Sequence, residues 1–240
     1  MQIRHQTIIL KTIQLCLLLL LLNSCTKGQR SFDEAIAQQK DSSLSFVPQN
    51  GESLPFFTPQ TLTPTWEESS KRQIVRIPEF HLLTQSGASI DQSLFKNHIS
   101  IVGFIFTSCT GFCPLLVKKM KDIEESFKGG TAPQFIVFSV DPEVDTPAKL
   151  NSFAKTHKLT SKNWTLITGD KQSIYSLAKE TFASEIRKID SSNMRDFAHT
   201  EHFYLIDGKL RLRGILNGSR IDLPEHAAAL VTELKNTLKQ

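Results

Sequence analysis

The feature that most constrains this sequence is the stretch 99–120, in which two cysteines separate an apolar run from an amphipathic one. Residues 99–106 are β-branched and aromatic, which is typical of a buried strand. After Cys113, apolar residues recur at helical spacing between lysines, and Pro114 suits the first turn of a helix. The pattern predicts a strand that runs into a helix, with Cys109 and Cys113 at the junction.

This junction gives the two thiols a chemical context. Parallel strands end at the sheet edge where ligand sites lie, and a helix N-terminus carries partial positive charge that stabilises a thiolate. Thiols four residues apart can share a soft metal ion or close a disulfide. A purely structural disulfide, or a pair of buried thiols, is the alternative that the spacing leaves open.

Residues 1–24 are predicted to be a lipoprotein signal peptide. Arg4 and Lys11 precede a leucine-rich run that is too short for a membrane span, and the segment ends in Leu-Asn-Ser-Cys. This ending resembles a bacterial lipobox, which implies cleavage before Cys25 and lipidation of its sulfur. An uncleaved N-terminal anchor is the alternative. Both place the domain outside the cytoplasm, tethered to a bacterial membrane and facing the periplasm.

The rest of the chain is expected to form a flexible tether over 25–71 and one folded domain over 72–240. The tether is rich in Ser, Gln, Thr and Pro, with little apolar periodicity. A formal charge of +4 is too small to indicate a nucleic-acid partner. Of the four cysteines, only Cys109 and Cys113 remain as thiols once the leader is removed and Cys25 is lipidated.

Strands and helices alternate through the domain, which predicts an α/β fold with parallel strands and right-handed crossovers. Strands are expected at 74–78, 80–84, 135–140, 164–168 and 203–206.

Asp141 follows one of these strands at the edge where we expect the cysteines, so it could support the ligands there. Turn chemistry at Asp141 is the alternative. Asp145 or Thr146 is expected to cap the next helix. The polar residues 185–196 are expected to form an irregular exposed loop.

The string F-I-F-T-S-C-T-G-F-C-P resembles the copper-site motif of the SCO/SenC proteins, F-x-F-T-x-C-x-x-x-C-P. The strings S-V-D-P-x-x-D-T-P and W-T-L-I-T-G-D also fit, and the resemblance covers 77–216. It implies a thioredoxin-like fold, with a central mixed sheet flanked by helices and an N-terminal hairpin extension. It also implies a membrane-tethered copper chaperone that delivers copper to the copper centre of cytochrome c oxidase, or reduces the cysteines there.

The resemblance further implies a histidine ligand. The family places it eight residues before a turn aspartate, in H-[ST]-x-x-x-Y-L-x-D, which fits His199 before Asp207. The chain departs from many members in carrying Ala198 where they have an acidic residue. His202 is expected to be held in the next strand. The expected ligands of Cu(I) or Cu(II) are Cys109, Cys113 and His199.

The expected partners are the oxidase subunit that receives copper, or its assembly factors, and the protein is expected to be a monomer. Metal loading and disulfide formation exclude each other, because copper binding needs both thiols reduced. Zinc would usually need a fourth ligand.

The competing hypothesis is an extracytoplasmic thiol–disulfide oxidoreductase, which would share the fold and the location. The Cys-x-x-x-Cys spacing differs from the Cys-x-x-Cys of thioredoxins, and residues 198–204 contain no proline. We therefore expect a metallochaperone rather than an enzyme, with thiol–disulfide reductase activity left open.

Overall fold

The computed structural model describes residues 54–66, 73–128, 130–184, 186–191, 194–198 and 201–238. The predicted signal peptide, Cys25 and His199 lie outside these ranges. None of the helices within them is long and apolar enough to cross a membrane.

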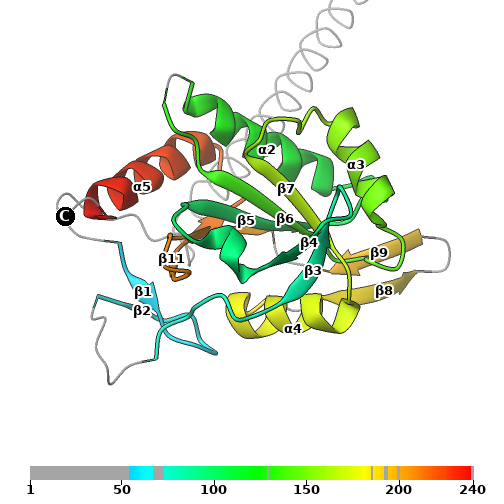
Figure 1. The fold of residues 1–240 in the computed structure, drawn as a ribbon, viewed down its shortest axis with the longest axis horizontal. Helices are drawn as coiled ribbons and strands as arrows, with labels where there is room; N and C mark the ends of the chain where they lie inside the picture. The colour runs from blue at the N-terminus through cyan, green and yellow to red at the C-terminus, as the bar shows by residue number, and fades with distance from the viewer. Residues whose placement is uncertain are drawn as a thin grey trace, which may run out of the picture. The chain divides into compact units, whose positions relative to one another are not determined.

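A seven-stranded mixed sheet forms the centre of the domain, in the order β11-β10-β5-β6-β7-β3-β4 (Figure 1). The three strands β5, β6 and β7 are parallel, and the flanking strands pair antiparallel. The predicted thioredoxin-like α/β fold with a central mixed sheet is therefore confirmed. The strands are β3 (His81–Thr84), β4 (Ser89–Asp91), β5 (Ser100–Ile105), β6 (Gln134–Ser139), β7 (Trp164–Thr168), β10 (His202–Ile206) and β11 (Leu212–Asn217).

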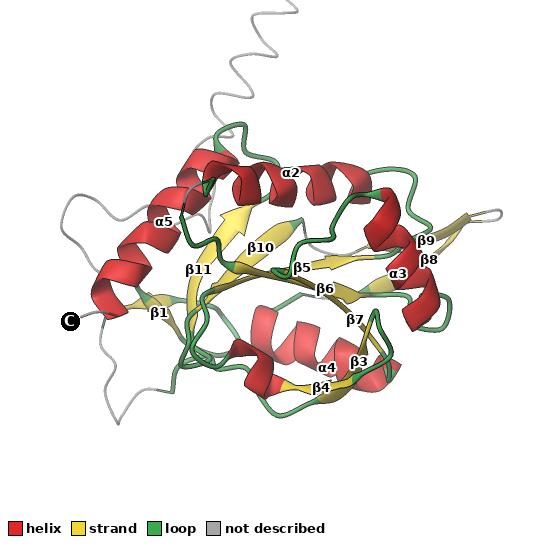
Figure 2. Cartoon of the chain, turned by 45° about the horizontal axis from the view of Figure 1, so that its top comes forward, coloured by secondary structure: helices red, strands yellow, loops and turns green. Residues whose placement is uncertain are grey.

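Helices cover both faces of this sheet. Figure 2 shows α2 and α5 on one side and α4 on the other. A short 3-10 helix, η2, leads from the β3–β4 hairpin toward β5. The helices are η2 (Gln92–Phe95), α2 (Cys113–Ser126), α3 (Pro147–Thr156), α4 (Lys171–Phe182) and α5 (Leu223–Leu238).

The core is aromatic on the α4 side of the sheet. The ring of Phe104 stacks on Phe138 and meets Phe182 and Tyr204 edge to face. On the other side, Gly103 leaves room for Phe203, because a Cβ at Gly103 would lie 3.1 Å from that ring. Successive side chains of β5 and β10 thus point alternately toward α4 and toward α2.

The folded domain begins earlier than the predicted boundary at residue 72. Leu54, Phe57 and Leu62 are buried within residues 54–66, which we call the strap. Within the strap, β1 (Phe56–Phe57) pairs with β2 (Pro64–Thr65) as a two-stranded sheet. The prediction failed here because these apolar residues follow neither helical nor strand spacing, so composition alone made the strap resemble the tether.

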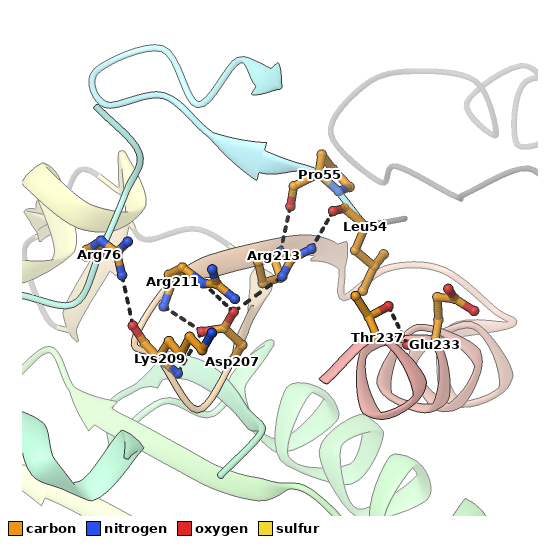
Figure 3. Close-up of polar contacts among 9 residues, drawn as sticks. All are labelled: Leu54, Pro55, Arg76, Asp207, Lys209, Arg211, Arg213, Glu233 and Thr237. Atoms are coloured by element: carbon orange, nitrogen blue, oxygen red, sulfur yellow. Dashed lines mark hydrogen bonds and ion pairs between the residues drawn. The ribbon is translucent and has the colours of Figure 1, made fainter. Parts of the chain in front are cut away.

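The side chain of Arg213 on β11 binds the backbone of the strap (Figure 3). Its Nε donates to the carbonyl oxygen of Pro55 at 3.0 Å, and its Nη2 donates to that of Leu54 at 2.5 Å. The Phe56 ring lies 4.2 Å from the guanidinium carbon. A buried arginine near the end of the chain thus fixes the start of the domain.

Asp207 neutralises this buried charge from the hairpin turn between β10 and β11. Its Oδ2 lies 2.7 Å from Arg211 Nε and 3.4 Å from Arg213 Nη1 (Figure 3). Its Oδ1 accepts the backbone N–H groups of Lys209 and Arg211. Ile206 pairs with Ser100 at the start of β5, so this cluster lies at the opposite end of β5 from the cysteine loop.

Two further local predictions were wrong. Within the polar stretch expected to be an irregular loop, β8 (Arg187–Ser191) and β9 (Met194–Ala198) form an antiparallel hairpin. The stretch 74–78, expected to be a strand, makes only an isolated bridge between Arg76 and Arg211. The polar hairpin lacks the apolar alternation by which a strand is recognised from sequence.

Candidate metal site

The two cysteines lie at the predicted strand–helix junction. Cys113 is the first residue of α2 and is buried, whereas Cys109 in the preceding loop is partly exposed. The backbone N–H of Cys113 donates to Cys109 Sγ at 3.4 Å, and no disulfide joins the two thiols. One sulfur is thus held at the N-terminus of a helix, where negative charge is stabilised.

Two exposed apolar side chains belong to the segment that carries the thiols. Phe112 and Leu115 are 39% and 41% exposed, which is unusual among the large apolar residues of the described chain. Cys109, which is itself partly exposed, is reachable from solvent in the same segment. This suits exchange with a small ion or with another protein's thiol.

Asp141 lies where the sequence placed it, just beyond the end of β6. Val140 N–H donates to the carbonyl oxygen of Ile105 at 2.8 Å, which aligns the ends of β6 and β5. Asp141 is buried, and its N–H donates to Ser139 Oγ at 3.1 Å. Burial, helped by the negative charges of Asp141 and Glu143, raises the pKa of Tyr175. The role of Asp141 toward the ligands stays a prediction.

Asp145 has a role that the sequence did not reveal. Thr146, not Asp145, caps α3. The side chain of Asp145 instead faces inward and is fully buried. The carboxylate accepts the N–H of Thr107 at 3.0 Å and also the Thr107 hydroxyl. Thr107 begins the cysteine loop, which is therefore attached to the segment after β6. Only the recurrence of aspartate in D-P-E-V-D-T-P pointed to this position.

His202 is held in the sheet, as the sequence predicted. It is the first residue of β10 and pairs with Asn217. It shares a face with Tyr204, whose hydroxyl donates to the carbonyl oxygen of Phe182 in α4. The alternate face of β10 packs toward α2. His202 thus lies on the face opposite the helix that carries Cys113, and burial lowers the pKa of its imidazole.

The third predicted ligand, His199, lies outside the described residues. Among the residues that are described, no group of three or more His, Cys, Asp or Glu side chains is arranged to hold a metal. The two thiols alone supply the soft donors that Cu(I) prefers. The donor chemistry therefore fits copper, and assignment of the histidine stays a prediction.

Gly218 fixes the start of β10, a constraint that the sequence did not show. Its N–H donates to the carbonyl oxygen of Glu201 at 3.1 Å. A Cβ at Gly218 would lie 2.3 Å from that oxygen and 2.8 Å from Leu116 Cδ2 of α2. Gly218 is thus packed closely between the backbone just before His202 and the side chain of Leu116 on α2.

Comparison with known proteins identifies relatives across this domain. The SCO1/SenC family model matches residues 68–236. The SCO1 protein homolog of Bacillus subtilis (strain 168) is 32% identical over 138 residues, which span 56% of this chain and 70% of that protein.

Solved structures agree. A SCO1/SenC family lipoprotein from Bacillus anthracis str. Ames superposes with a TM-score of 0.62 at 26% identity, covering 67% of this chain and 95% of that one. BsSco, a Sco family cytochrome c oxidase assembly protein with a disulfide switch, gives 0.58 at 25% identity, covering 67% and 94%. Bradyrhizobium japonicum ScoI with copper bound shares the fold, with a TM-score of 0.57 at 24% identity over 65% and 98% of the two chains. With its Cys-x-x-x-Cys pair at the strand–helix junction of a thioredoxin-like fold, this chain belongs to the SCO1/SenC family.

Proposed function

We propose that this chain is a membrane-tethered copper chaperone that binds Cu(I) or Cu(II) through Cys109, Cys113 and His199. It would serve the copper centre of cytochrome c oxidase by delivering copper or by reducing cysteines there. The observation that carries the proposal is the pair of unbridged thiols, with Cys113 N–H bound to Cys109 Sγ, in a member of the SCO1/SenC family.

The thiols give the site its selectivity and its switch. Soft sulfur donors favour Cu(I), and an added imidazole also supports Cu(II). Each sulfur must be reduced to bind, so the copper-loaded and disulfide forms are mutually exclusive. Cys109, the more exposed thiol, is the one that a partner reaches first, whereas Cys113 stays buried at the start of α2.

We also propose that Cys25 carries lipid and tethers the domain outside the cytoplasm as a monomer, within reach of an oxidase subunit or its assembly factors. The Leu-Asn-Ser-Cys ending supports this, as does the lipoprotein nature of the Bacillus anthracis relative. Mass spectrometry of the membrane-bound protein tests it. An unmodified Cys25 inside a longer chain would exclude the anchor.

The test of the copper site is an anaerobic titration with Cu(I), using a variant with Cys16→Ser and Cys25→Ser so that two thiols remain. We expect one copper per reduced chain, with both thiols protected from alkylation. The disulfide form and Cys109→Ser serve as comparisons, and both should lose high-affinity binding. Equal copper uptake by the oxidised and reduced forms would place the site elsewhere.

A thiol–disulfide oxidoreductase is the second candidate, because Cys109 is both partly exposed and unbridged. It requires the metal-free protein to reduce a disulfide substrate repeatedly when supplied with a reductant. Turnover that persists in His199→Ala, together with weak copper binding by the unaltered chain, would favour this alternative.

A further inference from the structure

We propose that Asp145 is a positioning residue for the thiol pair, and that it acts through Thr107 rather than by contact with copper. This inference deepens the proposed function, because it assigns the group that holds Cys109 beside Cys113. It rests on the hydrogen bonds that join the cysteine loop to the end of β6.

Thr107 is bound by Asp145 at two points. The Thr107 N–H donates to Asp145 Oδ2 at 3.0 Å, and the Thr107 hydroxyl donates to Asp145 Oδ1. Hydrogen bonds to a carboxylate are stronger than those between neutral groups. Thr107 stands two residues before Cys109, so the loop leaves β5 from a fixed point.

Asp145 is itself fixed from two further elements. Ser139 at the end of β6 donates its hydroxyl to Asp145 Oδ2 at 2.6 Å. Lys149 on α3 places its Nζ 3.8 Å from Asp145 Oδ1. A fully buried carboxylate is stable only when it is hydrogen-bonded or paired, and these contacts meet that need. The carboxylate therefore joins β6 and α3 to the start of the cysteine loop.

The loop between Thr107 and Cys113 is short and is held at both ends. Cys109 N–H donates to the carbonyl oxygen of Phe106 at 3.3 Å, and Cys109 Sγ accepts from the N–H of Cys113. Release of Thr107 would let the loop sample more conformations. The effective concentration of each thiol at the other would fall, since proximity depends on that restriction.

The sharpest test replaces single groups of this contact and measures disulfide closure without metal. The full chain with Cys16→Ser and Cys25→Ser is equilibrated with reduced and oxidised glutathione, and the closed fraction is read by alkylation and mass. In Thr107→Val the hydroxyl is lost but the side-chain volume is kept. We expect the equilibrium constant for closure to fall by about three- to tenfold, and Thr107→Ser to restore it.

Asp145→Asn should give the larger fall, because the amide presents an N–H group to one of its former donors. Its matched control is Glu124→Gln on α2. Glu124 accepts Trp164 Nε1 at 2.7 Å and Ser161 Oγ at 2.5 Å, about 16 Å along the helix from Cys113. Glu124→Gln should lower thermal stability and leave disulfide closure unchanged.

An unaltered closure constant in a folded Thr107→Val chain would overturn the inference, as would an equal fall in Glu124→Gln. Neither measurement uses copper. A chain that bound no copper but still showed the expected shifts would refute the proposed function and leave the positioning role intact.

Discussion

At the predicted copper site, one histidine is expected to add an imidazole to the two sulfurs. His202 begins β10 on the face of the sheet that packs on α4. If copper at Cys109 and Cys113 takes a nitrogen ligand from the α2 side, His202 is poorly placed to supply it. The position of His202 therefore argues against His202 as the ligand, and the assignment of His199 stays a prediction.

His199→Ala is expected to weaken Cu(I) binding partially and to abolish the thiolate-to-Cu(II) charge-transfer absorption. The two sulfurs still bind Cu(I), but Cu(II) loses its nitrogen donor. His202→Ala is the matched control and should keep the band. The measurement is the visible spectrum of the two Cu(II)-loaded variants. A band kept in His199→Ala and lost in His202→Ala would reverse the assignment.

Gly218→Ala is expected to destabilise the domain by about 1–3 kcal/mol, because the new methyl group has no room and the backbone must move. The atom that it meets is the carbonyl oxygen of Glu201, which lies 2.3 Å from the place a Cβ would occupy. Urea unfolding measures the loss. Gly111→Ala in the cysteine loop is the comparison, since a Cβ there meets nothing within 4 Å. Equal losses in the two variants would contradict the expectation.

Sequence placed some residues of the candidate site and not others, for a physical reason. Cys109, Cys113 and Asp141 stand at strand and helix ends that local periodicity predicts. The partners of Asp145 and Gly218 are distant in sequence: Thr107 is 38 residues from Asp145. A close backbone contact or a buried carboxylate has no local pattern, so only the folded chain reveals it.

At the scale of elements, the strap shows how one buried charge can hold a segment that has little regular structure. Its backbone carbonyls at Leu54 and Pro55 accept from Arg213, and Asp207 balances the charge. The parallel strands and the helices α2 and α3 were predicted because each has an apolar face. The strap was missed because the residue that holds it, Arg213, is distant in sequence. The β8–β9 hairpin was missed because its polar composition gives no apolar face.

Arg213→Met is expected to destabilise the domain by roughly 3–5 kcal/mol, the usual effect of removing one partner from a buried ion pair. It leaves Asp207 with one fewer cation and two strap carbonyls without their donor. The strap should also become sensitive to protease. Urea unfolding and limited proteolysis measure the two effects.

Arg76→Met is the control for this experiment. Arg76 is exposed and donates to the carbonyl oxygen of Lys209 at 3.1 Å, so its loss should change stability by less than about 1 kcal/mol. If Arg213→Met were no less stable than Arg76→Met, the strap would not depend on the buried cluster.

For the whole molecule, one buried and one half-buried histidine predict sensitivity to mild acid. His226 on α5 is 8% exposed, and its Nε2 has no hydrogen-bond partner among the described residues. Burial, reinforced by Arg220, lowers the pKa of His226, while Asp222 acts in the opposite direction. Burial likewise lowers the pKa of His202. Both imidazoles are therefore neutral in the folded protein at pH 7.

The free energy of unfolding should fall as the pH drops from 7 to 5. In this range the unfolded chain binds more protons at these histidines than the folded chain does, because folding lowers their pKa, so acid favours unfolding. Each histidine contributes at most about 1.4 kcal/mol per pH unit. His226→Leu should flatten the profile, as measured by urea unfolding at each pH. A stability that is constant or rises on acidification would refute this account.

The strap and the two thiols lie toward opposite ends of β5. The anchor of the strap at Arg213 lies toward the start of β5, and the thiols lie beyond the other end of that strand, about 20 Å away. If Cys25 is lipidated, the chain enters the described part of the domain at Leu54, in the strap. The chain from the membrane would then join the domain at the end remote from the thiols. The thiols would then face away from the membrane. A recipient whose copper ligands project well above the bilayer could meet them directly, whereas a recipient with ligands at the lipid surface would require the whole domain to rotate.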